Sequence, residues 1–340
     1  MFQVLENGPH CSNLPRLFKS MSISPSVIAE ELDLFESRFK EAVKSQVPML
    51  DRITRFIVKR KGKQLRPMFV LLTAKLCGEI TESTYRAASL VELLHTATLV
   101  HDDVVDESME RRGFFSTYAL WKTKVSVLIG DYLLAKGLLL SLDNNDFRIL
   151  QLLSEAVRRM SEGELLQIEK SRTLNLDESV YFEIISNKTA SLLAAACAAG
   201  AFSATLNEGQ AEKMRNFGEK VGIAFQIKDD LFDYGSADVG KPTGNDIKEK
   251  KLTLPLIYTL NKADSATRRK IINTIKNDSK NASKVKEVIS AVTAAGGIQY
   301  ATDKMNRFRD EALAILHEFP ENESRNALEE LVRFTTDRKY

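Results

Sequence analysis

The sequence predicts an all-α protein, and three observations lead to that prediction. Apolar residues recur at helical spacing in nearly every segment, as they do at Leu90, Leu93, Leu94 and Ala97. No segment shows the strict alternation of apolar and polar residues that indicates a half-buried strand. Breakers interrupt the pattern at short intervals, so the chain divides into roughly ten or more helices with the short connections typical of bundles.

The breakers set the order of the predicted helices. The first helix carries apolar residues from Ile28 to Val43 and ends before Pro48. Further breakers follow at residues 62–67 (GKQLRP), Gly78, Asn144 and Asn145, residues 174–179 (LNLDES), residues 207–209, residues 234–246 (YGSADVGKPTGND) and Pro320. No internal repeat, Pro/Ser-rich linker or change of composition divides the chain. We therefore expect one domain over residues 25–340, preceded by a disordered extension over residues 1–24.

Composition excludes several functional classes. The chain has 340 residues, of which 44% are hydrophobic, so a sizeable core is possible. Its 48 basic and 46 acidic residues give a formal net charge of +2 and form no basic tract, so we expect no nucleic-acid partner. The three cysteines, Cys11, Cys77 and Cys197, are odd in number and lack metal-ligand spacing. They predict reduced thiols in a cytoplasmic protein.

No segment predicts a transmembrane helix or a cleavable leader. The longest run of small apolar residues, 192–202 (LLAAACAAGAF), falls short of the roughly 20 residues that cross a bilayer, and it predicts a buried helix. Residues 1–20 contain Glu6, Gly8 and two prolines and lack a continuous apolar region, so they make a poor signal peptide. Met21 is an alternative start.

The stretch LVHDDVVDESMERRG, residues 99–113, places clustered acids and two adjacent arginines at the end of an apolar helical run. Residues four apart share a helix face, so Asp102 and Asp106 point the same way with Asp103 beside them. The same face carries His95 two turns earlier. A solvated helix end would account for the acids alone. However, the macrodipole makes a helix C-terminus favour cations, so another interaction must offset the repulsion.

The stretch FQIKDDLFDYG, residues 225–235, repeats this acidic spacing in the second half of the chain. It contains Asp229, Asp230 and Asp233, with Gln226 one turn earlier on the same face. Six clustered carboxylates would repel one another unless cations lay between them. Mg²⁺ prefers oxygen ligands and leaves positions for water and phosphate oxygens. The two stretches together predict a magnesium site.

Basic residues flank both acidic stretches. They are Lys63 and Arg66 in GKQLRP, Arg111 and Arg112 after the first stretch, Lys188 with Thr189 in NKTA, and Lys241 and Lys251 after the second stretch. Arginine matches phosphate oxygens with two hydrogen bonds, and lysine supplies a point charge. Each residue alone fits an ordinary surface position, but together they predict a site for more than one phosphorylated ligand. The sequence has no P-loop, GxGxxG, nucleophile elbow or HExxH motif.

These motifs resemble those of the trans-isoprenyl diphosphate synthase family, especially its long-chain members. The resemblance runs from about residue 30 to the C-terminus and rests on DDVVD, DDLFD, GKQLRP, RRG, NKTASLL and GKPTGNDIKEKKLTLPLI. It implies the isoprenoid synthase fold, a single large helical bundle around a deep apolar central cavity, usually in a homodimer. The usual Glu-Gly-Lys of the family is Glu249-Lys250-Lys251 here, and we align Lys251 with the family lysine.

The resemblance also implies a reaction and residue roles. The reaction is the condensation of isopentenyl diphosphate with an allylic diphosphate such as farnesyl diphosphate, with Mg²⁺ as cofactor and three ions per active site when substrate is bound. The implied metal ligands are Asp102, Asp103, Asp106, Asp229, Asp230 and Asp233. The implied allylic diphosphate site contains Arg111, Lys188, Lys241 and Lys251, with Thr189 and Gln226 as polar supports, and the isopentenyl diphosphate site contains Lys63, Arg66, His95 and Arg112. No protein nucleophile is needed, and His101 is expected to be structural.

Product length is expected to be set by side chains before the first acidic stretch. Ala97 and Thr98 are small where short-chain relatives carry aromatic rings, so the tunnel is expected to stay open. A floor is expected deeper, at Leu138, Leu140 and Leu153, with extra room at Ser141. By analogy with the family we expect about thirty to fifty carbons, about forty as the central value, suited to a quinone side chain.

Two other classes share parts of the pattern. A terpene cyclase shares the fold and the first acidic motif, but its second metal motif typically follows an Asn/Ser/Glu pattern, and DDLFD does not. A non-catalytic subunit of a two-component synthase would be expected to lack acids or arginines from the motifs, and this chain keeps them.

Overall fold

A computed structural model describes residues 25–59, 62–111, 113–174, 177–235 and 244–337. In its first half the elements are η1 Pro25–Ile28, α2 Ala29–Ala42, α3 Pro48–Lys59, α4 Leu65–Cys77, α5 Glu82–Val105, β1 Glu110–Arg111, β2 Phe114–Phe115, α6 Thr117–Leu142 and α7 Phe147–Thr173. They continue with α8 Glu178–Ile185, η2 Ser186–Ala190, α9 Ser191–Thr205, α10 Glu208–Phe232, α11 Asn245–Lys248, α12 Leu254–Lys262, α13 Ser265–Asn277, α14 Ala282–Ala294, α15 Gly297–His317 and α16 Glu323–Asp337. Of the predictions above, those for residues 1–24, Arg112 and Lys241 lie outside the described residues.

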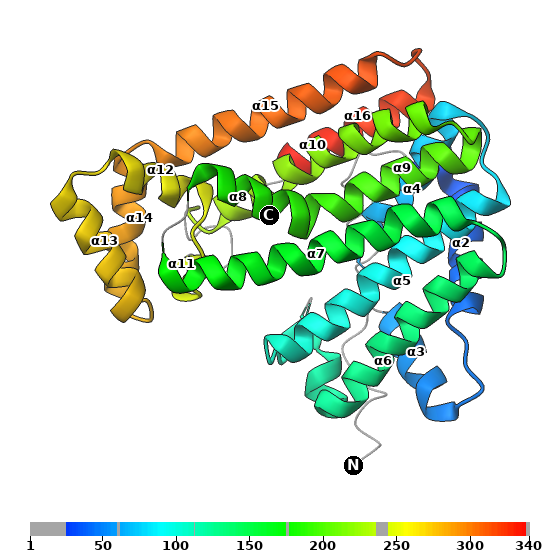
Figure 1. Cartoon of the computed structure of the whole chain (residues 1–340), viewed down its shortest axis with the longest axis horizontal. Helices are drawn as coiled ribbons and strands as arrows, with labels where there is room; N and C mark the ends of the chain where they lie inside the picture. The colour runs from blue at the N-terminus through cyan, green and yellow to red at the C-terminus, as the bar shows by residue number, and fades with distance from the viewer. Residues whose placement is uncertain (1–24, 60–61, 112, 175–176, 236–243, 338–340) are drawn as a thin grey trace.

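The prediction of an all-α fold is confirmed. Within the described ranges the only strands are β1 and β2, which form a two-residue antiparallel hairpin that pairs Arg111 with Phe114. Figure 1 shows the long helices α5, α6, α7, α9 and α10 as a bundle, with α12, α13 and α14 gathered at one end of it. The hairpin follows directly on α5, so it lies where the first acidic motif ends.

Helix α9 forms the centre of the bundle because its residues are small and apolar. Its side chains are buried almost throughout, and α4, α5, α7 and α10 pack around it. On α10, Gly218 faces Ala194 so closely that a Cβ added to the glycine would lie 2.8 Å from the alanine Cα. A larger side chain at this crossing would overpack the core and force the helices apart. The predicted buried helix at residues 192–202 is therefore confirmed.

Two hydrophobic clusters share the long helix α10. The first cluster includes Phe35, Phe69 and Phe217 and joins α2, α4 and the first half of α10. The second includes Ile227 and Ile257 and joins the end of α10 to α12 and the helices that follow. Because α10 is anchored in both clusters, its C-terminal acidic motif is held rigidly against the bundle.

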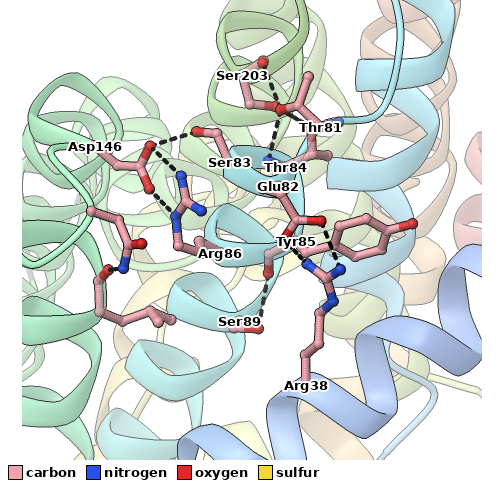
Figure 2. A network of polar contacts seen from close by, with 12 residues as sticks. Arg38, Thr81, Glu82, Ser83, Thr84, Tyr85, Arg86, Ser89, Asp146 and Ser203 are labelled. Carbon is pink, nitrogen blue, oxygen red and sulfur yellow. Dashed lines mark hydrogen bonds and ion pairs between the residues drawn. The ribbon is translucent and has the colours of Figure 1, made fainter.

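Polar contacts tie together the end of the bundle at the start of α5 (Figure 2). The Arg86 guanidinium donates to both carboxylate oxygens of Asp146, which precedes α7; its Nη2 lies 3.1 Å from Oδ1. The Ser83 hydroxyl donates to the same Oδ1 at 2.7 Å. Arg38 of α2 binds Glu82 with both of its terminal nitrogens. These contacts fix the α6–α7 connection and α2 to the N-terminus of α5. The aspartates lie at the opposite, C-terminal end of the same helix.

Two helical stretches are long and apolar enough to cross a membrane by length and composition alone. They are Thr117–Leu142, with 33% of its most apolar window buried, and Glu178–Thr205, with 72% buried. The second stretch is longer than the run at residues 192–202 suggests, because α8, η2 and α9 form one continuous helical segment. Its burial is that of a core helix, whereas α6 leaves much of its apolar surface uncovered by the chain.

We expect Asp146→Ala to lower the free energy of unfolding by about 2–3 kcal/mol, because it leaves a half-buried guanidinium without its carboxylate. Urea unfolding followed by circular dichroism measures the loss. Asp143→Ala is the control, since this carboxylate is exposed on the same connection, and we expect a change within about 0.5 kcal/mol. Equal losses in the two variants would contradict a role for the Arg86 pair.

Candidate active site

The acids of the first motif point to two different sides of α5. The helix ends at Val105, and Asp106 is the residue at its C-cap. Asp102 and Asp106 line a cleft of about 860 Å³. Asp103 is buried on the other side, where the Arg111 Nε lies 2.5 Å from its Oδ1. The motif therefore presents two carboxylates to the cleft, while the third is already neutralised by an arginine.

A second pocket lies on the Asp103 side of α5. Its walls include Glu92, Thr96, Asp103 and Arg111, and His95 lies in the same pocket. The sequence placed His95 on the helix face of Asp102 and assigned it to the isopentenyl diphosphate site; the imidazole lines this pocket beside Asp103 and not the Asp102 cleft. This pocket is also lined by side chains of α2, α3 and β2, so contacts from other elements decide the difference.

The second motif places its central aspartate in a chain of neutral hydrogen bonds. The Tyr181 hydroxyl donates to Asp230 Oδ2 at 2.7 Å, and Gln226 Nε2 donates to Oδ1 at 2.9 Å. The Thr189 hydroxyl donates in turn to Gln226 Oε1 at 2.7 Å. Burial raises the pKa of Asp230 to about 7, although the bonds from Gln226 and Tyr181 act to lower it. Thr189 and Gln226, both expected as polar supports, are therefore hydrogen-bonded to each other, a contact that the sequence did not predict. Tyr181 is a further partner that the sequence did not reveal.

Asp233 serves the backbone. Its Oδ1 accepts the Asn245 N–H at 2.7 Å and its Oδ2 accepts the Asp246 N–H at 3.1 Å, so both carboxylate oxygens cap the N-terminus of α11. This cap places Asp246 in the same pocket as Asp230. Burial, reinforced by the charge of Asp233, raises the pKa of Asp246 to about 6. Asp246 is thus a further acid of the site; its sequence signal was its place in the loop between α10 and α12.

Two lysines join the pockets into one site. Lys188 and Lys251 each line both the Asp102 cleft and the pocket of Asp230 and Asp246. Lys188 forms an ion pair with Glu164 of α7, and the Lys251 Nζ lies 2.5 Å from Glu249 Oε2. Lys250 instead donates to the Lys276 carbonyl of α13 at 2.9 Å. Acids of both motifs therefore lie in adjoining pockets that share two lysines.

The remaining diphosphate-binding residues lie on other elements. The Lys63 ammonium lies 4.7 Å from the centre of the Phe334 ring of α16, and Arg66 lies in the first turn of α4. His101 reaches α6, where its Nε2 lies 3.4 Å from Asp131 Oδ1, in agreement with a structural role.

The donor set fits a hard divalent ion that a bound diphosphate helps to hold. In the part of the chain that the structure describes, no three His, Cys, Asp or Glu side chains meet in a group that could hold a metal, so the expected cluster of six carboxylates does not form as one unit. Burial raises the pKa of Asp102, and Glu164 and Asp106 add to this against the opposing charge of Lys188. Such crowded oxygen ligands suit Mg²⁺, which commonly binds one or two carboxylates plus substrate phosphates.

The residues expected to control product length lie on adjoining helices. Ala97 is buried on the face of α5 that also carries Leu93 and His101, which pack over glycines of α6. Thr98 is half-buried, one turn before Asp102 on the adjacent face. Of the deeper set, Ser141 and Leu153 are buried, and Leu138 and Leu140 are half-buried.

An all-α bundle with aspartate-rich ends on two helices and lysines facing one cleft is the arrangement of a helical prenyltransferase. The family model described as Polyprenyl synthetase matches residues 47–292, and the chain belongs to this family.

Three similar proteins show the range of this family. All-trans-nonaprenyl-diphosphate synthase (geranyl-diphosphate specific) of Rhodobacter capsulatus is 35% identical over 94% of this chain and 98% of its own length. A polyprenyl synthase from Caulobacter crescentus, solved with calcium and isoprenyl diphosphate, has a TM-score of 0.86 and 34% identity over 94% of this chain and 99% of its own. A geranylgeranyl pyrophosphate synthase from Bacteroides thetaiotaomicron has a TM-score of 0.80 and 37% identity over 94% of this chain and 100% of its own. The chain is a polyprenyl diphosphate synthase, a prenyltransferase of isoprenoid biosynthesis.

We expect Asp246→Asn to stabilise the metal-free protein at high pH. The raised pKa means that the folded state binds a proton at Asp246 more tightly than the unfolded state, so stability is lost as pH rises from about 4 to about 6. Asparagine removes the charge that causes this loss. Urea unfolding in a chelator should show a gain of about 1–3 kcal/mol near pH 8 and little change near pH 4. The same effect at both pH values would contradict the assignment.

Proposed function

We propose that the protein condenses isopentenyl diphosphate with an allylic diphosphate such as farnesyl diphosphate to make a long-chain all-trans polyprenyl diphosphate. The observation that carries the proposal is the joined cleft, in which Lys188 and Lys251 line both the part that contains Asp102 and Asp106 and the part that contains Asp246. Carboxylates can bind divalent ions, and lysines beside them attract negative charge. The site therefore suits a ligand that carries several negative charges and is bound through divalent ions.

The cleft is proposed to bind the allylic diphosphate. Asp102, Asp106, Asp229 and their neighbours would hold Mg²⁺, about three ions in the family pattern, and the metal supplies neutralisation of the diphosphate as it leaves. Lys188 and Lys251 add point charges to the departing group, as Lys241 is expected to do. Thr189 and Gln226 form the polar wall beside the carbon that becomes positive.

The pocket beside Asp103 is proposed to bind isopentenyl diphosphate. It contains His95, which was expected in this site, with Lys63, Arg66 and Arg112 as the expected partners. Arg111, which the sequence assigned to the allylic diphosphate site, lines this pocket instead. Because this pocket and the cleft lie on neighbouring faces of α5, the two substrates can meet at the end of that helix. The double bond of isopentenyl diphosphate then attacks the allylic carbon, and loss of a proton gives the longer chain.

A homodimer fits the exposed apolar surface of α6. Val127, Leu128, Leu139 and Leu142 are all exposed there. Large exposed apolar surfaces mark interaction sites, and a second copy of this chain is the proposed occupant. A cytoplasmic location is proposed because Cys77 and Cys197 are free thiols.

The direct test is incubation with isopentenyl diphosphate, farnesyl diphosphate and Mg²⁺, with products identified by mass spectrometry. We expect products of about thirty to fifty carbons. Asp102→Ala and Asp229→Ala should each reduce turnover by at least about a thousandfold, because metal-held charge stabilisation is lost. Circular dichroism must show that both variants remain folded. Wild-type turnover in either folded variant would overturn its assignment.

We expect Ala97→Phe and Thr98→Phe to shorten the product towards about fifteen to twenty carbons, because either ring narrows the space one turn before Asp102. Turnover of the shorter chains should continue, since the metal-binding acids are unchanged. Ala314→Phe, at an exposed position of α15 away from this helix pair, is the control and should leave product length as it is. Unchanged products in both α5 variants would show that the tail runs elsewhere.

A further inference from the structure

A π-helical turn interrupts the helical segment that carries Lys188. Residues 178–185 and 191–205 are α-helical, and Ser186–Ala190 between them form a π-helix. A π turn holds one residue more than an α turn, is rare, and occurs often at functional sites. The turn carries both Lys188 and Thr189, so anything that stabilises it also sets the direction of these two side chains.

On one side the turn is held by α7. Arg159 donates from Nε to Asn187 Oδ1 at 2.9 Å and from Nη2 to Ser186 Oγ at 3.0 Å. One turn further along α7, Gly163 faces the backbone of the π turn, where an added Cβ would lie 2.8 Å from the Lys188 nitrogen. The backbone of α7 therefore packs directly against the backbone of the turn, without room for a side chain at residue 163. Arg159 of α7 binds the first two side chains of the turn.

On the other side the turn is held by α10. The Ser186 hydroxyl donates to Glu219 Oε1 at 2.5 Å, and the Arg159 Nη2 lies 3.2 Å from the same oxygen. One turn later, an added Cβ on Gly222 would lie 2.5 Å from the Ala190 Cα. Burial opposes the charge on Glu219, but hydrogen bonds from Ser186 and Arg159 lower its pKa, so the carboxylate is ionised.

The directions of the two site residues follow from this double support. Lys188 leaves the turn towards α7, where it pairs with Glu164 and lies 3.3 Å from Gln167 Oε1. Thr189 leaves towards α10 and binds Gln226. Glu164 lies beside Gly163, and Gln226 lies one turn after Gly222, the two glycines that contact the π turn. A turn that relaxed to α-helical form would rotate these side chains, since one residue corresponds to about 100° of helix.

We propose that Arg159, together with Ser186 and Glu219, is a positioning residue that acts through the π turn on Lys188 and Thr189. None of the three needs to touch substrate in this role. The inference rests on the proposed function of Lys188 in binding the allylic diphosphate. The neighbouring Arg158 provides a contrast, because its partners Glu155 and Glu162 lie on the exposed surface of its own helix.

The test is a double-mutant cycle on ligand binding. The probe is a farnesyl diphosphate analogue with sulfur in place of the bridging oxygen, titrated by calorimetry in the presence of Mg²⁺. Arg159→Met should weaken binding by about 10- to 100-fold, the range found when groups that orient metal ligands are removed. Lys188→Ala should weaken it at least as much, and adding Arg159→Met to Lys188→Ala should cause little further loss. Arg158→Met is the matched control and should bind as the wild type does.

A second readout separates positioning from general stability. Hydrogen exchange of the amides in the π turn should become faster in Arg159→Met while thermal unfolding shows a folded protein. If Arg159→Met fails to fold, Glu219→Gln takes its place in the same cycle. Wild-type binding in Lys188→Ala would overturn the proposed role of Lys188 itself. If Lys188→Ala weakens binding, then either wild-type binding in folded Arg159→Met or fully additive losses would overturn the positioning role.

Discussion

The mutual repulsion of carboxylates at the ends of two helices is the constraint on which this structure depends. α5 and α10 both end in aspartates, where the helix dipoles already disfavour negative charge. Burial increases the cost, as the raised pKa of Asp230 shows. The acids cannot hold the helices together, so the apolar packing around α9 must do so, and α10 is anchored in both hydrophobic clusters. The stability of the core maintains a site that is itself unfavourable until a cation binds.

The aspartates of the two motifs have different hydrogen-bond partners, and these partners decide which carboxylates keep an uncompensated charge. Arg111 neutralises Asp103, and backbone N–H groups occupy Asp233. Among the described residues, Tyr181 and Gln226 donate to Asp230, and both are neutral, so they orient the carboxylate without cancelling its charge. Hydrogen bonds to neutral partners fix geometry while leaving the electrostatic attraction for a divalent ion in place. The two motifs have the same spacing of aspartates, yet some of these carboxylates hold the fold together and others remain able to bind a ligand.

The sequence was sufficient for properties that depend on local periodicity. It predicted the helices and the buried helix at residues 192–202, because helical spacing places apolar side chains on shared faces. It did not predict that Tyr181 meets Asp230 or that Asp246 joins the site, since both contacts depend on how distant segments pack. Helical spacing put His95 on the face of Asp102, yet it lines the pocket of Asp103, because spacing locates a side chain on a helix but the neighbouring elements decide which space it lines.

The π turn has a consequence for how such a protein could change over evolutionary time. Because the turn contains one residue beyond an α-helical turn, deletion of a single codon within Ser186–Ala190 would restore a continuous α-helix from α8 to α9. Provided that the core around the buried Ala190 repacks, Lys188 and Thr189 would lose their directions together. A gene copy altered in this way would encode a folded chain that no longer catalyses. Duplication followed by one small deletion is thus a short route to a subunit with the same fold and a different task.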